Sequence, residues 1–241
     1  MTEHDSKPFL AILVGDSLSM PRYEAGVQVE DTYSYSLEMW WRERYSRVIT
    51  WSLSEGGVTL QHLVGNSHDF LSRVGPGRID VCIVHLGIVD CAPRPLPYLM
   101  RLGLSLAPPI LRNRAVNFLH QNRQKLFKLG WSFRFTSPSK FGKIYSDLIQ
   151  LLNLQCRRVY VINIAPGLET VYRHSPGLKE SIVRYNEIIG KATFGMDGVK
   201  SIDAFGEFQN APERYLTADL HITKEAHNWI CEQIVGYEEF V

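Results

Sequence analysis

An unbroken apolar run close to the start of the chain constrains the fold more than any other feature. The run covers residues 8–13 and passes directly into Val14-Gly15-Asp16-Ser17-Leu18. A short continuous apolar run is typical of a strand buried on both faces, as in a parallel sheet between helices. Gly15 allows a sharp turn after this strand. Ser17 then stands just past the carboxyl end, where open α/β sheets bind their ligands.

Strand-like and helix-like segments alternate along the rest of the chain. Further strands are expected at 47–51, 79–86, 157–164 and 199–202, and helices at 31–45, 60–70, 178–192 and 223–235. Strands that alternate with helices predict a parallel, three-layer α/β sheet. The sequence has no internal repeat and no linker rich in Gly and Ser, so its 241 residues are predicted to form a single domain, 1–241.

The composition disfavours a membrane-spanning protein, a metal-binding protein and a disulfide-bonded protein. Charged residues make up 21% of the chain and the net charge is +1, and no apolar stretch approaches the roughly 20 residues of a membrane span. The four scattered cysteines fit neither a metal site nor a disulfide framework, and Cys82 is expected to be a buried thiol. We therefore expect no metal, no cofactor and a reducing, cytoplasmic setting. The cysteines are Cys82, Cys91, Cys156 and Cys231.

The stretch from Cys91 to Ser146 differs from the rest of the chain. It contains ten Lys and Arg residues and no Asp or Glu, and prolines interrupt its first half. Residues 110–129 within it are predicted to form a basic amphipathic helix. The stretch is either a solvated face beside the sheet or a cap that favours an anionic substrate or partner. Docking on a membrane surface is less favoured, and no recognised module points to nucleic acid.

A serine nucleophile needs a histidine that removes its proton and a carboxylate that orients this histidine. His221 is the best candidate, because it lies in the loop before the last predicted helix and can reach the strand ends. His227 falls inside that helix and His85 inside a strand. Both of these are expected to pack in the core.

Four segments, in this order along the chain, resemble the SGNH or GDSL hydrolases. This family contains esterases, lipases, thioesterases and carbohydrate O-deacetylases. The first segment is Gly15-Asp16-Ser17-Leu18, the second contains Gly57, the third is Gly87-Ile88-Val89-Asp90, and the fourth contains His221. The resemblance runs from about residue 8 to residue 235, and the basic insert of residues 91–146 interrupts it. It implies a flavodoxin-like sheet of about five parallel strands between helices, with the insert after the third strand.

The resemblance also implies roles for individual residues. Ser17 would be the nucleophile and His221 the base, and the N–H groups of Ser17 and Gly57 would bind the oxyanion. Val89 stands where the family has an Asn as third donor, and loss of one such donor typically costs about 2.7–4 kcal/mol. Asp90 would repel the oxyanion while ionised, whereas Arg94 is a candidate substitute donor.

The position of the triad carboxylate departs from the family pattern. The pattern Asp-x-x-His places this group at position 218, which is Ala218, and the neighbouring Asp219 would point the other way in an extended loop. Three interpretations stay open: an aspartate at 218 in the natural protein, Asp219 acting through a shifted backbone, or a dyad of Ser17 and His221. The regularity of the surrounding segment favours the first.

The function that the resemblance implies is hydrolysis of a small acyl ester through a serine acyl-enzyme, without metal or cofactor. The substrate would be an O-acetylated sugar, another small ester or an acyl thioester, and the basic insert suits an anionic or carrier-bound one. Two alternatives stay open. One is acyl transfer on the same fold, and the other is a binding module whose catalytic machinery has decayed, as Val89 and Ala218 indicate.

Overall fold

Five parallel strands form one sheet in the order β2-β1-β3-β4-β5. The structure is a computed structural model that describes residues 7–73 and 75–239, without the side chains of 67–73, 98, 99, 101 and 120. The predicted parallel sheet is confirmed. Its strands are β1 (Phe9–Gly15), β2 (Val48–Ser52), β3 (Ile79–His85), β4 (Cys156–Ile162) and β5 (Val199–Ile202).

The burial of the strands follows their sequence pattern. Every residue of β3 is buried, and so is every residue of β1 except Leu10, because these two strands lie inside the sheet. The edge strands β2 and β5 are largely exposed or half-buried. The apolar runs therefore mark the strands whose carboxyl ends lie at the centre of the sheet.

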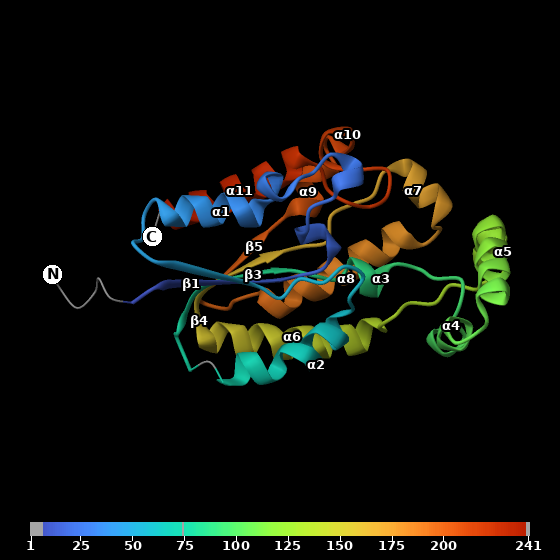
Figure 1. Cartoon of the computed structure of the whole chain (residues 1–241), viewed down its shortest axis with the longest axis horizontal. Coiled ribbons are helices and arrows are strands. Elements are labelled where there is room, and N and C mark those ends of the chain that lie inside the picture. The colour runs from blue at the N-terminus through green and yellow to red at the C-terminus, as the bar shows by residue number, and fades with distance from the viewer. Residues whose placement is uncertain (1–6, 74, 240–241) are drawn as a thin grey trace.

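Helices cover both faces of the sheet (Figure 1). Two of them, α1 (Tyr33–Arg42) and α11 (Lys224–Glu239), pack together on one face. The other face carries α2 (Leu60–Arg73), α6 (Pro138–Gln155) and α8 (Leu178–Thr193), with α6 in contact with both of its neighbours. The result is the predicted arrangement of helices on both sides of a parallel sheet.

Helix α6 has no counterpart among the predicted elements. Its first turn is capped by Ser137, whose side chain accepts the N–H of Lys140 at 3.4 Å, and Pro138 follows at the first helical position. Phe141 and Tyr145 are fully buried against the sheet. Helix α6 belongs to the helical layer. The part of the basic stretch that lies outside the three layers is therefore limited to residues before Pro138.

That outlying part is a pair of helices, α4 (Tyr98–Ser105) and α5 (Pro109–Lys128). Both stand beyond the carboxyl ends of the strands, apart from the three layers (Figure 1). Most described side chains of α5 are exposed, whereas Phe127 near its end is buried. The predicted basic helix is thus present and projects from the same end of the sheet as Ser17.

Shorter elements and buried side chains complete the fold. Among the described residues no helix is long and apolar enough to cross a membrane. His85, His227 and Cys82 are buried as predicted, and all four cysteines are free. The short helices are η2 (Ser17–Ser19), η3 (Tyr23–Ala25), η4 (Val29–Asp31), α3 (Ile88–Cys91), α7 (Glu169–His174), α9 (Ala204–Phe208) and α10 (Pro212–Tyr215).

Candidate active site

The chain turns sharply after β1, and Ser17 is the first residue of η2. Asp16 before it is fully buried, and its carboxylate accepts the N–H groups of Leu18 at 3.0 Å and Gly87 at 3.1 Å. Gly87 follows β3, so its hydrogen bond to Asp16 links the turn after β1 to the end of the neighbouring strand. Burial raises the pKa of Asp16 to about 7, although the backbone N–H groups act against this shift.

The loop after β2 lies beside this turn. The hydroxyls of Ser19 and Ser54 are hydrogen-bonded at 3.0 Å, and the N–H of Glu55 donates to the Gly15 carbonyl at 3.2 Å. A Cβ on Gly15 would stand only 2.8 Å from Ser54 Oγ. The absence of a side chain at Gly15 therefore allows the two loops to approach each other.

Gly57, at the end of the second loop, has a φ of +75°, in the left-handed region that glycine tolerates best. Its N–H and that of Ser17 donate no hydrogen bond to any residue that the structure describes. Both residues line the same cleft. The two N–H groups are therefore available to an acceptor that enters the cleft.

Helix α3 contributes Val89 to the cleft but places Asp90 elsewhere. The Asp90 carboxylate is buried, where it accepts the N–H of Leu60 at 2.9 Å and the hydroxyl of Thr136. The hydroxyl of Tyr185 in turn donates to the Thr136 carbonyl. Burial raises the pKa of Asp90. This side chain joins α2, α3 and the segment before α6, and it is not among the residues that line the cleft.

His221 lies in a tight loop between α10 and α11. Thr217 closes the loop, since its N–H donates to the His221 carbonyl at 2.9 Å and its Oγ accepts the His221 N–H at 3.1 Å. The loop is not extended, contrary to expectation. Leu220 has a φ of 72° and is the one non-glycine residue with a positive φ in the described part of the chain. Such a backbone is strained for leucine, and it lets the side chains on either side of it meet.

These two side chains are Asp219 and His221. Asp219 Oδ2 lies 3.1 Å from Nδ1 of His221, which is an ion-pair distance without the alignment of a hydrogen bond. The same oxygen accepts Nη2 of Arg22 at 2.6 Å, and Oδ1 accepts the Thr217 hydroxyl at 2.5 Å. Partial burial alone would raise the pKa of Asp219, but these donors and the imidazole hold it well below its usual range. Ala218 is exposed and does not line the cleft.

One cleft of about 380 Å³ collects most of the predicted residues at the carboxyl ends of the strands. Ser17, Gly57, Asp219 and His221 all line it. Within the described residues, no three side chains of His, Cys, Asp or Glu gather as metal ligands would. The remaining lining residues are Arg22, Gly56, Ile88, Val89, Ala92, Arg94, Arg123, Ser175, Leu178 and Leu220.

Two of the charged lining residues, Arg22 and Arg123, were not assigned to the site from the sequence. Arg22 follows η2 in an irregular segment, and nothing in the sequence relates it to Asp219. Arg123 had a weak signal, because it belongs to the basic stretch without acidic residues. Its direction toward the cleft depends on how α5 is placed.

The chain matches no family model and no curated protein, but it matches solved structures. The lipase/acylhydrolase from Enterococcus faecalis aligns with 95% of this chain and 94% of its own, at 12% identity and a TM-score of 0.63. The acetyl xylan esterase AlAXEase aligns with 95% and 99%, at 20% identity and a TM-score of 0.60. This chain has the SGNH/GDSL hydrolase fold. A lipolytic G-D-S-L family protein from Veillonella parvula DSM 2008 matches 95% of this chain and 97% of its own, with 12% identity and a TM-score of 0.56.

The SGNH fold explains why residues so distant in sequence share one cleft. Its parallel strands all end at one edge of the sheet, so the loops after β1, β2 and β3 meet there. The loop before α11 reaches the same edge and adds Asp219 and His221. At these sequence identities the likeness establishes the fold.

Proposed function

We propose that this protein is a serine ester hydrolase of the SGNH type. The observation that carries the proposal is that Ser17 and His221 line one cleft, with the Asp219 carboxylate against the Nδ1 of the imidazole. The fold, which solved structures of esterases and lipases share, supports it.

In the proposed reaction, Nε2 of His221 removes the proton of the Ser17 hydroxyl while its Oγ attacks the acyl carbonyl. The carbonyl oxygen becomes an oxyanion, which the free N–H groups of Ser17 and Gly57 bind. His221 then gives the proton to the leaving oxygen, and the alcohol departs. A water molecule attacks the acyl-enzyme by the same route and releases the acid and Ser17.

We assign the third role to Asp219 in place of residue 218. A triad carboxylate holds the imidazole in the correct tautomer and stabilises its protonated form. Asp219 is the carboxylate found at Nδ1, and the contacts from Arg22 and Thr217 keep it ionised and in place. Ala218 is exposed and does not line the cleft, which favours Asp219 over position 218 for this role.

The oxyanion site has two backbone donors in this proposal, because the Val89 side chain can donate nothing. The missing donor would cost about 2.7–4 kcal/mol of transition-state stabilisation. Arg94 lines the cleft close to Val89 in sequence and adds a positive charge to it. The expected consequence is a slow hydrolase.

The proposed substrate is a small acyl ester, with no metal or cofactor in the reaction. A cleft of about 380 Å³ lies toward the small end of the range for ligand pockets, roughly 300–1,000 Å³. An O-acetylated carbohydrate is one such ester, as for the acetyl xylan esterase of the same fold. Acyl thioesters and transfer of the acyl group to an alcohol use the same residues.

Replacement of Ser17 tests the proposal directly. We expect the protein to hydrolyse at least one member of a panel of acetyl and longer-chain esters and thioesters, and a fluorophosphonate to label Ser17. The Ser17→Ala variant should retain its fold by circular dichroism and lose both turnover and labelling, because the half-buried side chain makes no hydrogen bond among the described residues. Full activity in Ser17→Ala would exclude this mechanism.

The same panel separates the alternatives. A protein that neither turns over any ester nor reacts with the fluorophosphonate would be a binding module, the reading that Val89 favours. A product that is mainly the ester of an added alcohol, at an alcohol concentration far below that of water, would instead identify an acyltransferase.

A further inference from the structure

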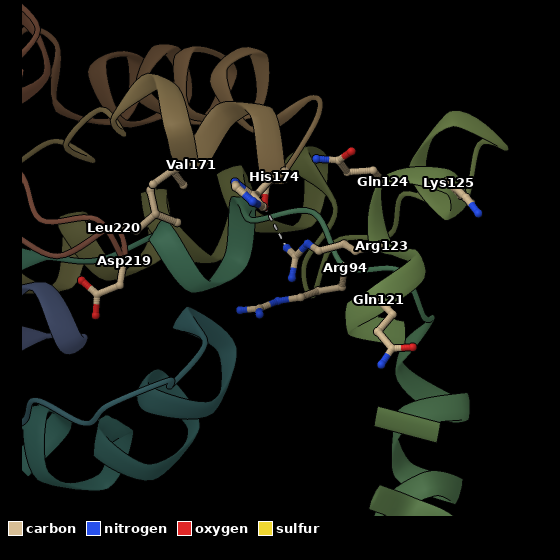
Figure 2. Close-up of a pocket in the computed structure, with 10 residues that line it drawn as sticks. Arg94, Gln121, Arg123, Gln124, Lys125, Val171, His174, Asp219 and Leu220 are labelled. Atoms are coloured by element: carbon tan, nitrogen blue, oxygen red, sulfur yellow. Dashed lines mark hydrogen bonds between the residues drawn. The ribbon is translucent and has the colours of Figure 1, made fainter. Parts of the chain in front are cut away.

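Two arginines that the reaction does not use reach the cleft from different elements. Arg94 follows α3 and Arg123 lies on α5, and both are half-buried. Each lines the active-site cleft and also a neighbouring cavity of about 670 Å³, here called the outer hollow. Figure 2 shows their side chains extending from the side of α5 toward the side that carries Asp219 and Leu220. The pair therefore stands where the two cavities join.

Neither guanidinium has an acidic partner among the described residues. Arg123 donates through Nη2 to Ser175 Oγ at 2.9 Å and to the Pro93 carbonyl at 3.2 Å. Arg94 lies over the ring of Phe135, 5.3 Å from its centroid. The Nε atoms of both arginines are buried and make no hydrogen bond.

Of the residues that the structure describes, Asp219 is the one acidic residue that lines these two cavities, and its carboxylate is already engaged. Asp219 contacts Arg22, Thr217 and His221, so it does not neutralise the pair. The other polar groups of the outer hollow are neutral or basic, and these are Gln121, Gln124, Lys125, His174 and Ser175. Burial lowers the pKa of Arg94 and of Arg123, and the charge of Arg94 lowers that of Arg123 further.

Two half-buried cations that repel each other and have no counter-charge are unfavourable unless an anion joins them. A guanidinium presents a planar fork of donors that matches a carboxylate or phosphate group. We propose that Arg94 and Arg123 form a subsite for the carboxylate or phosphate group of an anionic ester. The inference rests on the proposed hydrolase for its catalytic consequence, and it names the substrate class of that enzyme.

Matched esters test the subsite by turnover. The probes are phenyl acetate and its two analogues with a carboxylate or a phosphate group in the para position. The readout is kcat/KM for each anionic ester divided by kcat/KM for phenyl acetate. We expect Arg94→Gln and Arg123→Gln to lower this ratio by about tenfold or more, through KM, since each removes a charge-assisted hydrogen bond. Whichever ratio falls further identifies the group.

The chain offers a matched control on the same helix. Arg112 is exposed on α5 and lines neither cavity, so Arg112→Gln removes the same charge without touching the pair. We expect it to leave the ratio unchanged. The Arg123→Lys variant keeps the charge but loses the fork, and its ratio should fall between wild type and Arg123→Gln. A ratio that is equal in all variants, or that falls equally in Arg112→Gln, would overturn the subsite.

A binding measurement makes the result independent of catalysis. Calorimetric titration of the Ser17→Ala protein with benzoate and with phenyl phosphate should give a Kd that weakens about tenfold in Arg94→Gln and Arg123→Gln. If the anions bind in an arginine-dependent way but the wild-type protein hydrolyses no ester, the subsite is supported and the hydrolase is rejected. Ester hydrolysis without arginine-dependent anion binding would do the opposite.

Discussion

The two halves of the site are held in contrasting ways. The Ser17 turn rests on Asp16, which is fully buried and bonded to backbone N–H groups of two loops. The His221 loop rests on Asp219, which is exposed and bonded to side chains. Burial raises the pKa of the first carboxyl to about 7, whereas charged and polar donors lower that of the second.

This contrast predicts different roles for the two carboxylates. Asp16 fixes the nucleophile by joining β1 to β3, so its loss is expected to affect the fold. Asp219 stands at the imidazole without supporting the sheet, so its loss is expected to affect the rate. The two acidic residues can therefore be distinguished by what their removal changes, which is the stability of the fold for Asp16 and the rate for Asp219.

The largest expected effect is on the rate, from Asp219. We expect Asp219→Asn to lower kcat by on the order of 10²–10⁴-fold, because the imidazole loses the partner that sets its tautomer. KM should change little, since the carboxylate acts mainly on the transition state. Steady-state kinetics on the best ester of the panel measures both.

The matched variant is Ala218→Asp, which places a carboxylate where the family pattern expects one. It should give no gain in kcat, because residue 218 is exposed and outside the cleft. A gain of about a hundredfold or more there, with little loss in Asp219→Asn, would return the third role to position 218.

A stability effect of intermediate size is expected from Asp16. Its pKa rises from 3.8 in the unfolded chain to about 7 in the folded protein, so folding favours the protonated carboxyl. This contribution is fully present below pH 3.8 and is lost as the pH rises through about 7. We expect the Asp16→Asn variant to lack this fall, which is on the order of a few kcal/mol in the free energy of unfolding.

Urea unfolding at pH 5 and pH 8 measures the effect as a difference between wild type and Asp16→Asn. The difference is needed because two buried histidines act in the opposite direction. Burial lowers the pKa of His85 to about 3 and that of His227 to about 4, so both add stability that is lost on acidification below about pH 6.5. Identical pH profiles for the two proteins would show that Asp16 does not titrate in this window.

The smallest expected effect concerns the strained residue of the His221 loop. At a φ of 72° a β-branched side chain is worse than leucine, so Leu220→Val should cost about 1–3 kcal/mol of stability. Leu220→Gly relieves the strain but adds freedom to the unfolded chain, and its net change should stay within about 1 kcal/mol. Denaturant midpoints for the two variants give the comparison. Equal losses would mean that side-chain packing over Gly167, and not the backbone, determines the effect.

The sequence predicts the sheet well because its signals are local. The apolar run of β3 is buried throughout and the strand ends at His85, within a residue of expectation. Helix α6 carried equally local signals in Ser137, Pro138 and the spacing of Phe141 and Tyr145, but the basic residues around it concealed them. Helix α6 was missed because the helix signals and the pattern of basic residues occur in the same segment.

The site was less predictable because it depends on backbone geometry and long-range contacts. The proposed role of Asp219 depends on the left-handed conformation of Leu220, which leucine rarely adopts and which no residue pattern predicts. The contact of Arg22 with Asp219 joins positions 197 apart. The sequence shows Arg123 as one charge of the basic stretch, but the direction of its side chain toward the cleft depends on where α5 is placed.

The order of the site's parts along the chain has a consequence for synthesis. Asp16, beside Ser17, binds Gly87, 71 positions later, and this contact can form once Gly87 has left the ribosome, since chains fold from the N-terminus as they are made. The loop of Asp219 and His221 emerges far later, 197 positions after the Arg22 to which it binds. A nascent chain therefore carries Ser17 for most of synthesis without His221, the base of the proposed reaction. If the proposed mechanism holds, such a chain gains its reactivity toward esters only when the last helix docks.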